Sequence, residues 1–264
     1  MFTQKKYYGP PKSILITGAS DGIGAGLAEY YATEGVTLFL SGRNEERLLR
    51  ITKNCQKKGA DVFPMIVDVT DQARMQAWMD QCDDKVPLDL VIANAGISGG
   101  TGSEGESIDQ ARQIYNVNVK GVFNTIGPAI DRMTPRKHGQ IAIMSSLSAF
   151  NGWAGAPAYS SSKAAVRTYG EGLRIDLKNK NIRVNVICPG FVKTAMTDRN
   201  DFSMPFLMSV EKAAIAIANG LAANKGRIVF PWQMYGIVGF IGILPYFLCE
   251  KIMRFAPAKA DLPQ

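Results

Sequence analysis

The stretch SILITGASDGIGAGLAEYY, residues 13–31, decides the fold of this chain. It opens with the apolar run SILIT, which predicts a short strand buried on both faces of a sheet. Glycines follow at Gly18, Gly22 and Gly24, a G-x-x-x-G-x-G spacing that leads directly into a helical segment. The spacing matches neither G-x-G-x-x-G nor a P-loop, which needs a Lys-Ser/Thr pair after its last glycine.

This order of strand, turn and helix is typical of a phosphate-binding turn. Gly18 permits a tight turn, Gly22 and Gly24 allow the backbone to approach a ligand, and the helix offers free N–H groups to a pyrophosphate. Ser20 and Ile23 belong to the same predicted cofactor-binding turn. A glycine-rich turn that binds no ligand is the alternative interpretation.

The rest of the chain repeats the alternation of apolar runs and helical segments. One long helix is expected between the glycine-rich loop at 98–105 and about Met133. The pattern predicts an α/β fold, a doubly wound parallel sheet of about seven strands with helices on both faces. After 13–17, the strands are predicted at 37–41, 61–69, 88–96, 139–146, 182–190 and 226–230.

Length and composition suit one large domain. The chain has 264 residues, 46% of them apolar, and contains neither a linker rich in Pro, Gly or Ser nor a repeat. We therefore predict a catalytic, dinucleotide-binding domain over 1–230 and an apolar helical extension over 231–264. The formal net charge is +7, but Lys and Arg are scattered without a basic run. This favours a polyphosphate ligand, and no nucleic-acid partner is expected.

The cysteines and the only histidine exclude several kinds of site. Four widely separated cysteines with no CxxC pair predict neither disulfides nor a metal site, and they favour a reducing compartment. The N-terminus has no apolar core behind its lysines, so no secretory signal is expected and a cytoplasmic location follows. His138 is expected in a solvated turn, which makes a Ser-His-Asp hydrolase improbable.

The end of the second predicted strand indicates which dinucleotide binds. An acidic residue there favours NAD, whereas an arginine favours the 2′-phosphate of NADP. The sequence reads LSGRNEE, so Arg43 stands where the acid would be. Its fork of donors suits a phosphate, although a surface ion pair with Glu45 or Glu46 is an alternative. NADP(H) is therefore expected in preference to NAD(H).

Separated motifs in a fixed order connect this chain to a known family. The motifs are TGASDGIG at 17–24, DVTD at 68–71, NAG at 94–96, NVNVKG at 116–121, SS at 145–146, YSSSK at 159–163 and PGFVKT at 189–194. With these motifs the sequence resembles the short-chain dehydrogenase/reductase family over roughly residues 12–230, which implies a Rossmann-like fold and a homodimer or homotetramer.

The resemblance assigns roles to individual residues. It implies Tyr159 as the catalytic acid/base, Lys163 as its partner, Ser146 as the serine that orients the substrate, and Asn118 as the support of a proton relay. Tyr159 and Lys163 are also expected to contact the cofactor, and Thr194 to reach the nicotinamide amide. The other cofactor-binding residues that it implies are Asp68, Val69, Asn94, Ala95, Gly96, Pro189, Gly190 and Val192.

The chemistry explains the spacing of Tyr159 and Lys163. A lysine at i+4 shares a helix face with the tyrosine, and its charge is expected to lower the tyrosine pKa toward neutrality. The serines between them need only be small. Burial of Ala165, Tyr169, Leu173 and Leu177 is expected to outweigh their poor helix propensity.

Two segments are expected to select the substrate. LSAFNGWAGAPA at 147–158 and AMTDRNDFSMPFLM at 195–208 follow strand ends, where ligand sites and lids occur. Their large apolar side chains suggest a lipophilic carbonyl or alcohol substrate, or else packing against the tail. These side chains are Phe150, Trp153, Phe202, Phe206 and Met208.

The tail departs from a minimal member of the family. An uncharged run from Met234 to Cys249 would span about 24 Å as a helix, short of the roughly 30 Å of a bilayer core. Lys251, Arg254 and Lys259 follow it. The alternatives are peripheral membrane contact through 234–254, packing against the pocket or another subunit, and, least favoured, a membrane span.

We therefore predict an NADP(H)-dependent oxidoreductase that acts on a carbonyl or secondary alcohol. A dinucleotide-binding sensor or scaffold whose tail recruits a partner or membrane is the rival. The presence of Asn118, Ser146, Tyr159 and Lys163 argues against that rival.

Overall fold

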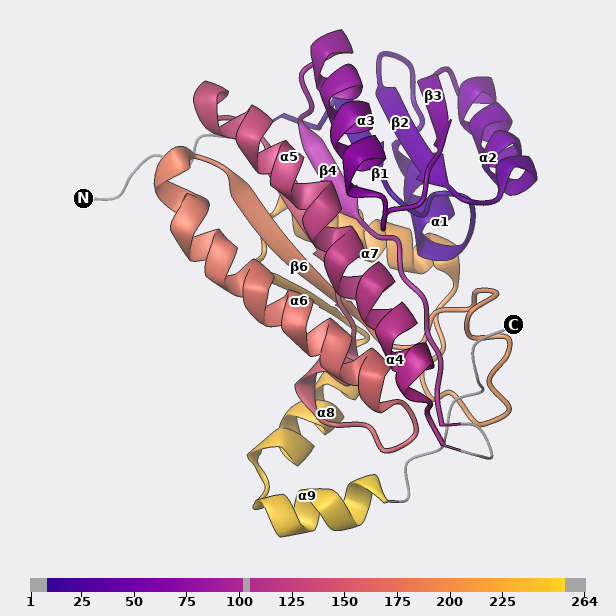
Figure 1. The fold of residues 1–264 in the computed structure, drawn as a ribbon, viewed down its shortest axis with the longest axis vertical. Helices are drawn as coiled ribbons and strands as arrows, with labels where there is room; N and C mark the ends of the chain where they lie inside the picture. Colours follow the sequence, from indigo (N-terminus) through magenta and orange to yellow (C-terminus); the bar gives the residue numbers. More distant parts are fainter. Residues whose placement is uncertain (1–8, 102–104, 255–264) are drawn as a thin grey trace.

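A seven-stranded parallel sheet forms the centre of the protein (Figure 1). The computed structural model describes residues 9–101 and 105–254. The strand order is β3-β2-β1-β4-β5-β6-β7, so the chain reverses its winding direction between β1 and β4. The predicted doubly wound α/β fold is confirmed. The strands are β1 (Ser13–Ile16), β2 (Thr37–Gly42), β3 (Asp61–Ile66), β4 (Leu90–Ala93), β5 (Gln140–Met144), β6 (Arg183–Pro189) and β7 (Arg227–Phe230).

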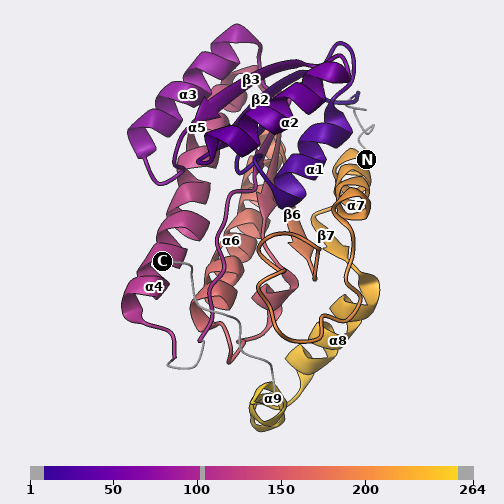
Figure 2. The ribbon, with the colours of Figure 1, turned by 90° about the vertical axis from the view of Figure 1, so that its right-hand side faces the viewer.

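Helices cover both faces of the sheet (Figures 1 and 2). One face carries α1 (Gly22–Tyr31), α2 (Glu45–Lys57) and α7 (Val210–Ala222). The other carries α3 (Gln72–Lys85), α4 (Ile108–Tyr115), α5 (Gly121–Arg136) and α6 (Pro157–Asp176). Each face has its own apolar core, because a parallel sheet buried on both sides presents apolar side chains in both directions.

Short polar side chains start most of these helices. Asp21, Asn44, Asp71 and Ser209 each accept a hydrogen bond from a backbone N–H of the first turn of the helix that follows. Such caps satisfy donors that have no partner within the helix. The helix starts therefore follow from local sequence.

The long helix expected before Met133 is interrupted. It consists of α4, a π-helical turn at Asn116–Lys120, and α5. The π turn carries Asn118, which is fully buried and whose carboxamide pairs with the backbone of Ile97. A π turn in a helix is often associated with a functional site.

The predicted buried face of α6 is partly wrong. Ala165 and Tyr169 are exposed, whereas Ser162, Val166 and Gly170 face the sheet. A Cβ atom at Gly170 would lie 2.7 Å from Val186 Cγ2, so the helix packs closely against the sheet at that point. The close approach at Gly170 rotates the buried face by about one residue from the predicted one.

The apolar tail forms two helices. α8 (Trp232–Ile243) and α9 (Tyr246–Met253) meet at Leu244 and Pro245 and project beyond the carboxyl ends of the strands (Figures 1 and 2). Among the residues that the structure describes, no helix is long and apolar enough to cross a membrane. Lys259 of the predicted extension lies outside the described residues, as do 1–8 and 102–104.

Candidate active site

A cleft of about 760 Å³ opens at the carboxyl ends of the strands, beside the reversal point between β1 and β4. Ligands of doubly wound proteins bind at this position. All but two of the predicted site residues line the cleft, the exceptions being Gly24 and Asn118. Those that line it are Gly18, Ser20, Gly22, Ile23, Arg43, Asp68, Val69, Asn94, Ala95, Gly96, Ser146, Tyr159, Lys163, Pro189, Gly190, Val192 and Thr194.

The glycines of the first turn differ in what they permit. Gly18 and Gly22 have φ values of 66° and 56°, in the left-handed region that favours glycine. Gly24 does not face the cleft: a Cβ atom there would lie 2.3 Å from the Gly18 carbonyl oxygen and 2.5 Å from Asn94 Nδ2. Gly24 therefore allows α1 to pack under the turn, and the prediction that it lets the backbone approach a ligand is wrong.

Asn94 joins the first turn to the end of β4. Its Nδ2 donates to the carbonyl oxygens of Thr17 at 2.9 Å and Gly18 at 3.1 Å. The Thr17 hydroxyl in turn accepts hydrogen bonds from the backbone N–H groups of Asn94 and Ala95. These bonds hold the two central strand ends together as one floor of the cleft.

Arginine side chains border the end of the cleft next to β2. Arg43 NH1 lies 3.7 Å from Asp68 Oδ2, and its side chain is 65% exposed. It pairs with neither Glu45 nor Glu46, the surface partners considered as an alternative. Arg47 also lines the cleft and pairs with Asp21 at 3.3 Å. Sequence reasoning missed Arg47, although it lies only four residues after Arg43, in the first turn of α2.

Tyr159 and Ser146 meet on the opposite wall. Both side chains are buried apart from about a tenth of their surface, and the two form a hydrogen bond. Burial raises the pKa of Tyr159 above its usual value, while the Ser146 hydrogen bond acts in the opposite direction. Ser146 Oγ also accepts from the backbone N–H of Ser148 at 3.1 Å, which fixes its position at the start of a short 3-10 helix, Leu147–Phe150.

Lys163 lies beside Tyr159 without reaching its hydroxyl. Its Nζ donates to the Met144 carbonyl oxygen at 3.0 Å and lies 5.9 Å from the centroid of the Tyr159 ring. Burial lowers the pKa of Lys163 to about 8. The expected lowering of the Tyr159 pKa by this ammonium is not found: burial of the phenol raises that pKa, and the hydrogen bond from Ser146 is what acts against the rise.

Asn118 lies behind the wall of the cleft. Its Nδ2 donates to the Ile97 carbonyl oxygen and to Ser162 Oγ, each at 3.0 Å. Ser162 donates to the Tyr159 carbonyl oxygen at 2.8 Å, so it links Asn118 to the helix that carries Tyr159. The serines between Tyr159 and Lys163 were expected only to be small, and this hydrogen-bonded role of Ser162 corrects that interpretation.

The apolar residues predicted for the substrate side divide into two groups. Trp153 and Phe202 line the cleft. Phe150 instead packs against Tyr235 of α8, with ring centroids 5.4 Å apart. Phe206 is 46% exposed and Met208 packs against the core below α7, so neither lines the cleft.

The tail and the 195–208 segment contribute lining residues that the sequence did not single out. Met234 and Val238 of α8 border the cleft, as does Arg199, whose NH2 donates to the Ser98 carbonyl oxygen at 3.0 Å. The apolar character of α8 was visible in the sequence, but its inward face was not. Within residues 9–101 and 105–254, no group of three or more His, Cys, Asp or Glu side chains lies close enough to hold a metal ion.

A doubly wound sheet whose glycine turn borders a long cleft at the winding reversal defines a dinucleotide-binding α/β protein. The family model described as short chain dehydrogenase matches residues 12–203. The chain belongs to the short-chain dehydrogenase/reductase family and is an oxidoreductase of that family.

Individual relatives agree with this assignment. The chain is 37% identical to an uncharacterized oxidoreductase of Myxococcus xanthus over 92% of this chain and 96% of the relative. A short-chain dehydrogenase/reductase of Burkholderia phymatum, solved with NAD, has the same fold, with a TM-score of 0.80, 23% identity and complete coverage of both chains. A short-chain dehydrogenase of Sphingobium yanoikuyae, solved with NADPH, has a TM-score of 0.76 and 23% identity, over 88% of this chain and 96% of that one.

Proposed function

We propose that the protein is an NADP(H)-dependent oxidoreductase that interconverts a lipophilic carbonyl compound and the corresponding secondary alcohol. One observation carries the proposal: a buried phenol, Tyr159, is hydrogen bonded to Ser146 on the wall of the cleft, one helical turn before Lys163. A proton donor next to a hydroxyl that can orient a carbonyl oxygen is what carbonyl reduction requires.

The cleft fits a nicotinamide dinucleotide. Gly96 lines the cleft and leaves room for the side chains behind it, since a Cβ atom there would lie 3.1 Å from Asn118 Oδ1 and 3.2 Å from Lys163 Nζ. The N-terminus of α1 would hold the pyrophosphate, and Asp68 and Val69 would border the adenine. Thr194 and Lys163 would hold the nicotinamide riboside. The bound cofactor would supply or accept a hydride.

The arginines beside β2 favour NADP(H). Arg43 and Arg47 both line this end of the cleft, and both have carboxylate neighbours that only partly occupy their donors. A guanidinium has five N–H donors, so each arginine retains donors for a 2′-phosphate. The solved relatives differ, one holding NADPH and the other NAD, so the choice rests on these side chains.

Tyr159 would give its phenolic proton to the carbonyl oxygen during reduction and take it back during oxidation. Burial raises the pKa of Tyr159, so the hydroxyl keeps its proton at neutral pH, which suits reduction. Ser146 would hold the carbonyl oxygen beside that hydroxyl. Lys163, with a pKa of about 8, carries a positive charge at neutral pH and would stabilise the phenolate that forms.

Asn118 would support this proton transfer from behind the cleft. Its carboxamide and Lys163 Nζ border the same space beside Gly96. It also fixes Ile97 and, through Ser162, the first turn of α6. We propose that Asn118 fixes the positions of Lys163 and Tyr159 relative to each other.

The substrate side of the cleft favours an apolar molecule. Trp153, Phe202, Met234 and Val238 line it, and they come from separate segments of the chain. This convergence supports a lipophilic substrate.

We further propose that residues 1–230 form the catalytic unit, and that the protein acts in the cytoplasm as a homodimer or homotetramer.

A cofactor and substrate screen tests the proposal. The purified protein is mixed with NADPH or NADH and ketones of increasing chain length, and the nicotinamide absorbance is followed. We expect NADPH to be consumed, and faster with the longer ketones. Tight NADPH binding without turnover of any ketone would favour the rival function, a dinucleotide sensor or scaffold.

A further inference from the structure

The two tail helices form one continuous apolar projection, called here the apolar arm (residues 232–254). No charged residue occurs from Trp232 to Cys249. Among the large apolar and aromatic side chains of the arm, five are more than 60% exposed. These are Trp232 at 75% exposure, Phe240 at 61%, Ile243 at 80%, Tyr246 at 80% and Phe247 at 68%.

One side of α8 is firmly attached to the catalytic unit. Tyr235 packs edge-on against Phe150, and Asn151 Nδ2 donates to the Val238 carbonyl oxygen at 2.8 Å. Val238 and Met234 also pack against the buried Leu147 and Cys188. α8 therefore has a fixed inner side. The exposed residues of the arm lie on the other sides of α8 and on α9.

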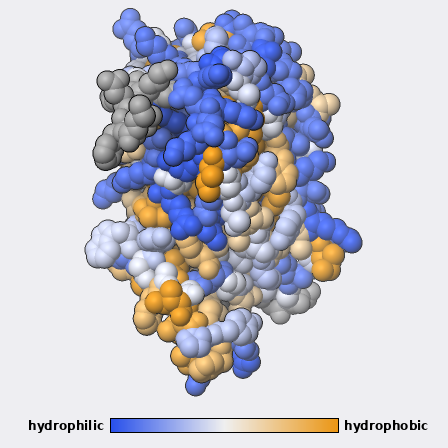
Figure 3. Space-filling model, turned by 90° about the vertical axis from the view of Figure 1, so that its left-hand side faces the viewer, coloured by the Kyte–Doolittle hydropathy of each residue, from blue (hydrophilic) through white to orange (hydrophobic). Residues whose placement is uncertain are grey.

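The outer side of α8 is almost entirely apolar, and Gln233 is its one strongly polar residue. In an ordinary surface helix the residues opposite the buried stripe are polar. Here Trp232, Phe240 and Ile243 fall on that side of α8, and Gly236 and Gly239 between them have no heavy atom within 4 Å of a Cβ position. Figure 3 shows apolar side chains gathered at the lower end of the molecule, where the arm lies. Apolar patches of this kind mark interaction sites.

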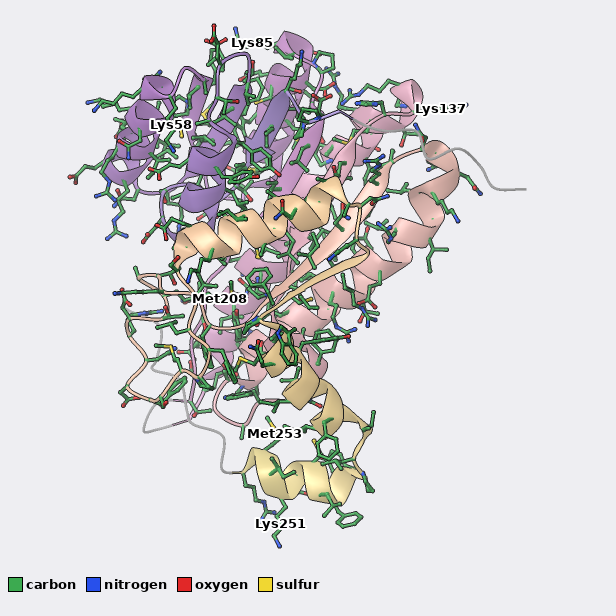
Figure 4. The ribbon with its side chains drawn as sticks, turned by 180° about the vertical axis from the view of Figure 1, so that it is seen from behind. Lys58, Lys85, Lys137, Met208, Lys251 and Met253 are labelled. Atoms are coloured by element: carbon green, nitrogen blue, oxygen red, sulfur yellow. The ribbon has the colours of Figure 1, made fainter. Side chains whose placement is uncertain are left out.

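The kinds of residue exposed on the arm suit contact with a lipid surface. Trp232 and Tyr246 have the amphipathic rings that occupy the boundary between headgroups and acyl chains. Lys251 lies on α9 and points away from the body of the protein, on the opposite side of the helix from Met253 (Figure 4). Arg254 is paired with Glu250 at 2.8 Å, which leaves Lys251 to contact an anionic headgroup. α8 has 12 residues, about 18 Å of helix, so it suits an interfacial position.

We propose that the apolar arm inserts its outer side, with Ile243 and Phe247 at the tip, into the surface of a membrane containing anionic lipid. The same helix borders the cleft through Met234 and Val238. Docking by this arm places the substrate side of the cleft at the lipid surface, so that a long-chain carbonyl compound reaches it from the bilayer. The membrane docking is inferred from the residues of the arm alone. The delivery of substrate rests on the function proposed above.

Vesicle flotation tests the docking. The full-length protein is mixed with vesicles of phosphatidylcholine, with or without phosphatidylglycerol as a minor component. We expect it to float with the anionic vesicles, and Ile243→Ser and Phe247→Ser each to lower the partition coefficient roughly tenfold. Ile175→Ser is the matched control, because Ile175 is 78% exposed but lies on α6, and it should float like the wild type. Lys251→Glu should reduce the preference for phosphatidylglycerol.

Two further measurements separate membrane docking from misfolding and from self-association. NADPH affinity and the thermal midpoint of each variant should equal those of the wild type, because the substituted side chains are exposed. Light scattering without lipid should give the same mass for the wild type and Ile243→Ser. Two results would overturn the proposal. A lower mass for Ile243→Ser would show that the arm is a contact between copies of this chain. Wild-type protein that floats with neither kind of vesicle would show that the arm does not bind membranes.

Substrate delivery has its own test. Ile243→Ser should turn over a short water-soluble ketone like the wild type but lose most of its rate on a long-chain ketone dissolved in anionic vesicles. Equal rates on the vesicle-borne ketone would contradict delivery from the bilayer. If neither ketone reacts with either protein while flotation succeeds, the proposed oxidoreductase function fails and the docking remains.

Discussion

Lys163 Nζ lies 5.9 Å from the centroid of the Tyr159 ring, and it donates its hydrogen bond to the Met144 carbonyl oxygen at 3.0 Å instead of to the phenol. Ser146 is the residue that forms a hydrogen bond with the Tyr159 side chain, while Lys163 lies beside the ring. In the proposed reaction, Tyr159 is the proton donor and Lys163 stabilises the phenolate.

Replacement of Tyr159 by Phe should abolish turnover and spare cofactor binding. The change removes the proton donor and keeps the ring, so we expect kcat to fall about 100- to 10,000-fold. Tyr169→Phe is the matched control, because Tyr169 lies on the same helix with an exposed side chain. Steady-state rates and titration of NADPH fluorescence check both variants. A Tyr159→Phe enzyme that kept most of its rate would show that another group supplies the proton.

Replacement of Arg43 by Ala should weaken NADPH binding selectively. Loss of a charge-assisted contact with the 2′-phosphate should raise the Kd for NADPH roughly 10- to 100-fold and leave the Kd for NADH nearly unchanged. Arg50→Ala is the control, since Arg50 is exposed on α2 and does not line the cleft. Isothermal titration with both cofactors measures the effect, and equal losses for NADPH and NADH would contradict a phosphate contact.

Gly24→Ala should destabilise the protein although its side chain would not enter the cleft. The added methyl group would lie 2.3 Å from the Gly18 carbonyl oxygen, a backbone atom that cannot move aside easily. We expect the free energy of unfolding to fall by about 1–3 kcal/mol. Gly127→Ala, in α5 with no heavy atom within 4 Å, should instead be neutral or stabilising by about 0.5–1 kcal/mol. Urea unfolding of the two variants compares them directly, and equal midpoints would show that α1 shifts freely.

Asp83 should make the stability of the protein depend on acid pH. Its side chain is buried, which by itself raises its pKa, but hydrogen bonds from Arg136, the Leu88 backbone and Arg132 hold the pKa below its usual value. Because the pKa of Asp83 is lower in the folded than in the unfolded chain, this stabilisation is present above about pH 4 and is lost as the pH falls through the folded value.

Asp83→Asn should therefore lower the free energy of unfolding by about 1–3 kcal/mol at pH 7, with a smaller difference from the wild type at pH 3. Denaturant midpoints at the two pH values measure this. If the difference in unfolding free energy between wild type and Asp83→Asn were the same at both pH values, the charge of Asp83 would not be the cause of the lost stability.

The sequence by itself determined the order of the elements and most of the residues that meet in the cleft. Apolar runs predicted all seven strands, and for β1 and β4 the reason is that a strand buried on both faces is apolar throughout. The carboxyl ends of parallel strands lie at one edge of the sheet, so motifs that follow different strands, such as Asn94 after β4 and Ser146 after β5, meet without any knowledge of the packing.

Only the tertiary structure decided what depends on the exact approach of one element to another. The π turn at Asn118, the packing role of Gly24 and the hydrogen bond from Asn118 to Ser162 arise from contacts between segments far apart in the chain. The same holds for the pKa of Tyr159, which burial raises where local spacing to Lys163 had predicted a lower value. Composition shows that α8 is apolar, but the position of β7 and Phe150 decides that Val238 faces the cleft while Ile243 remains exposed.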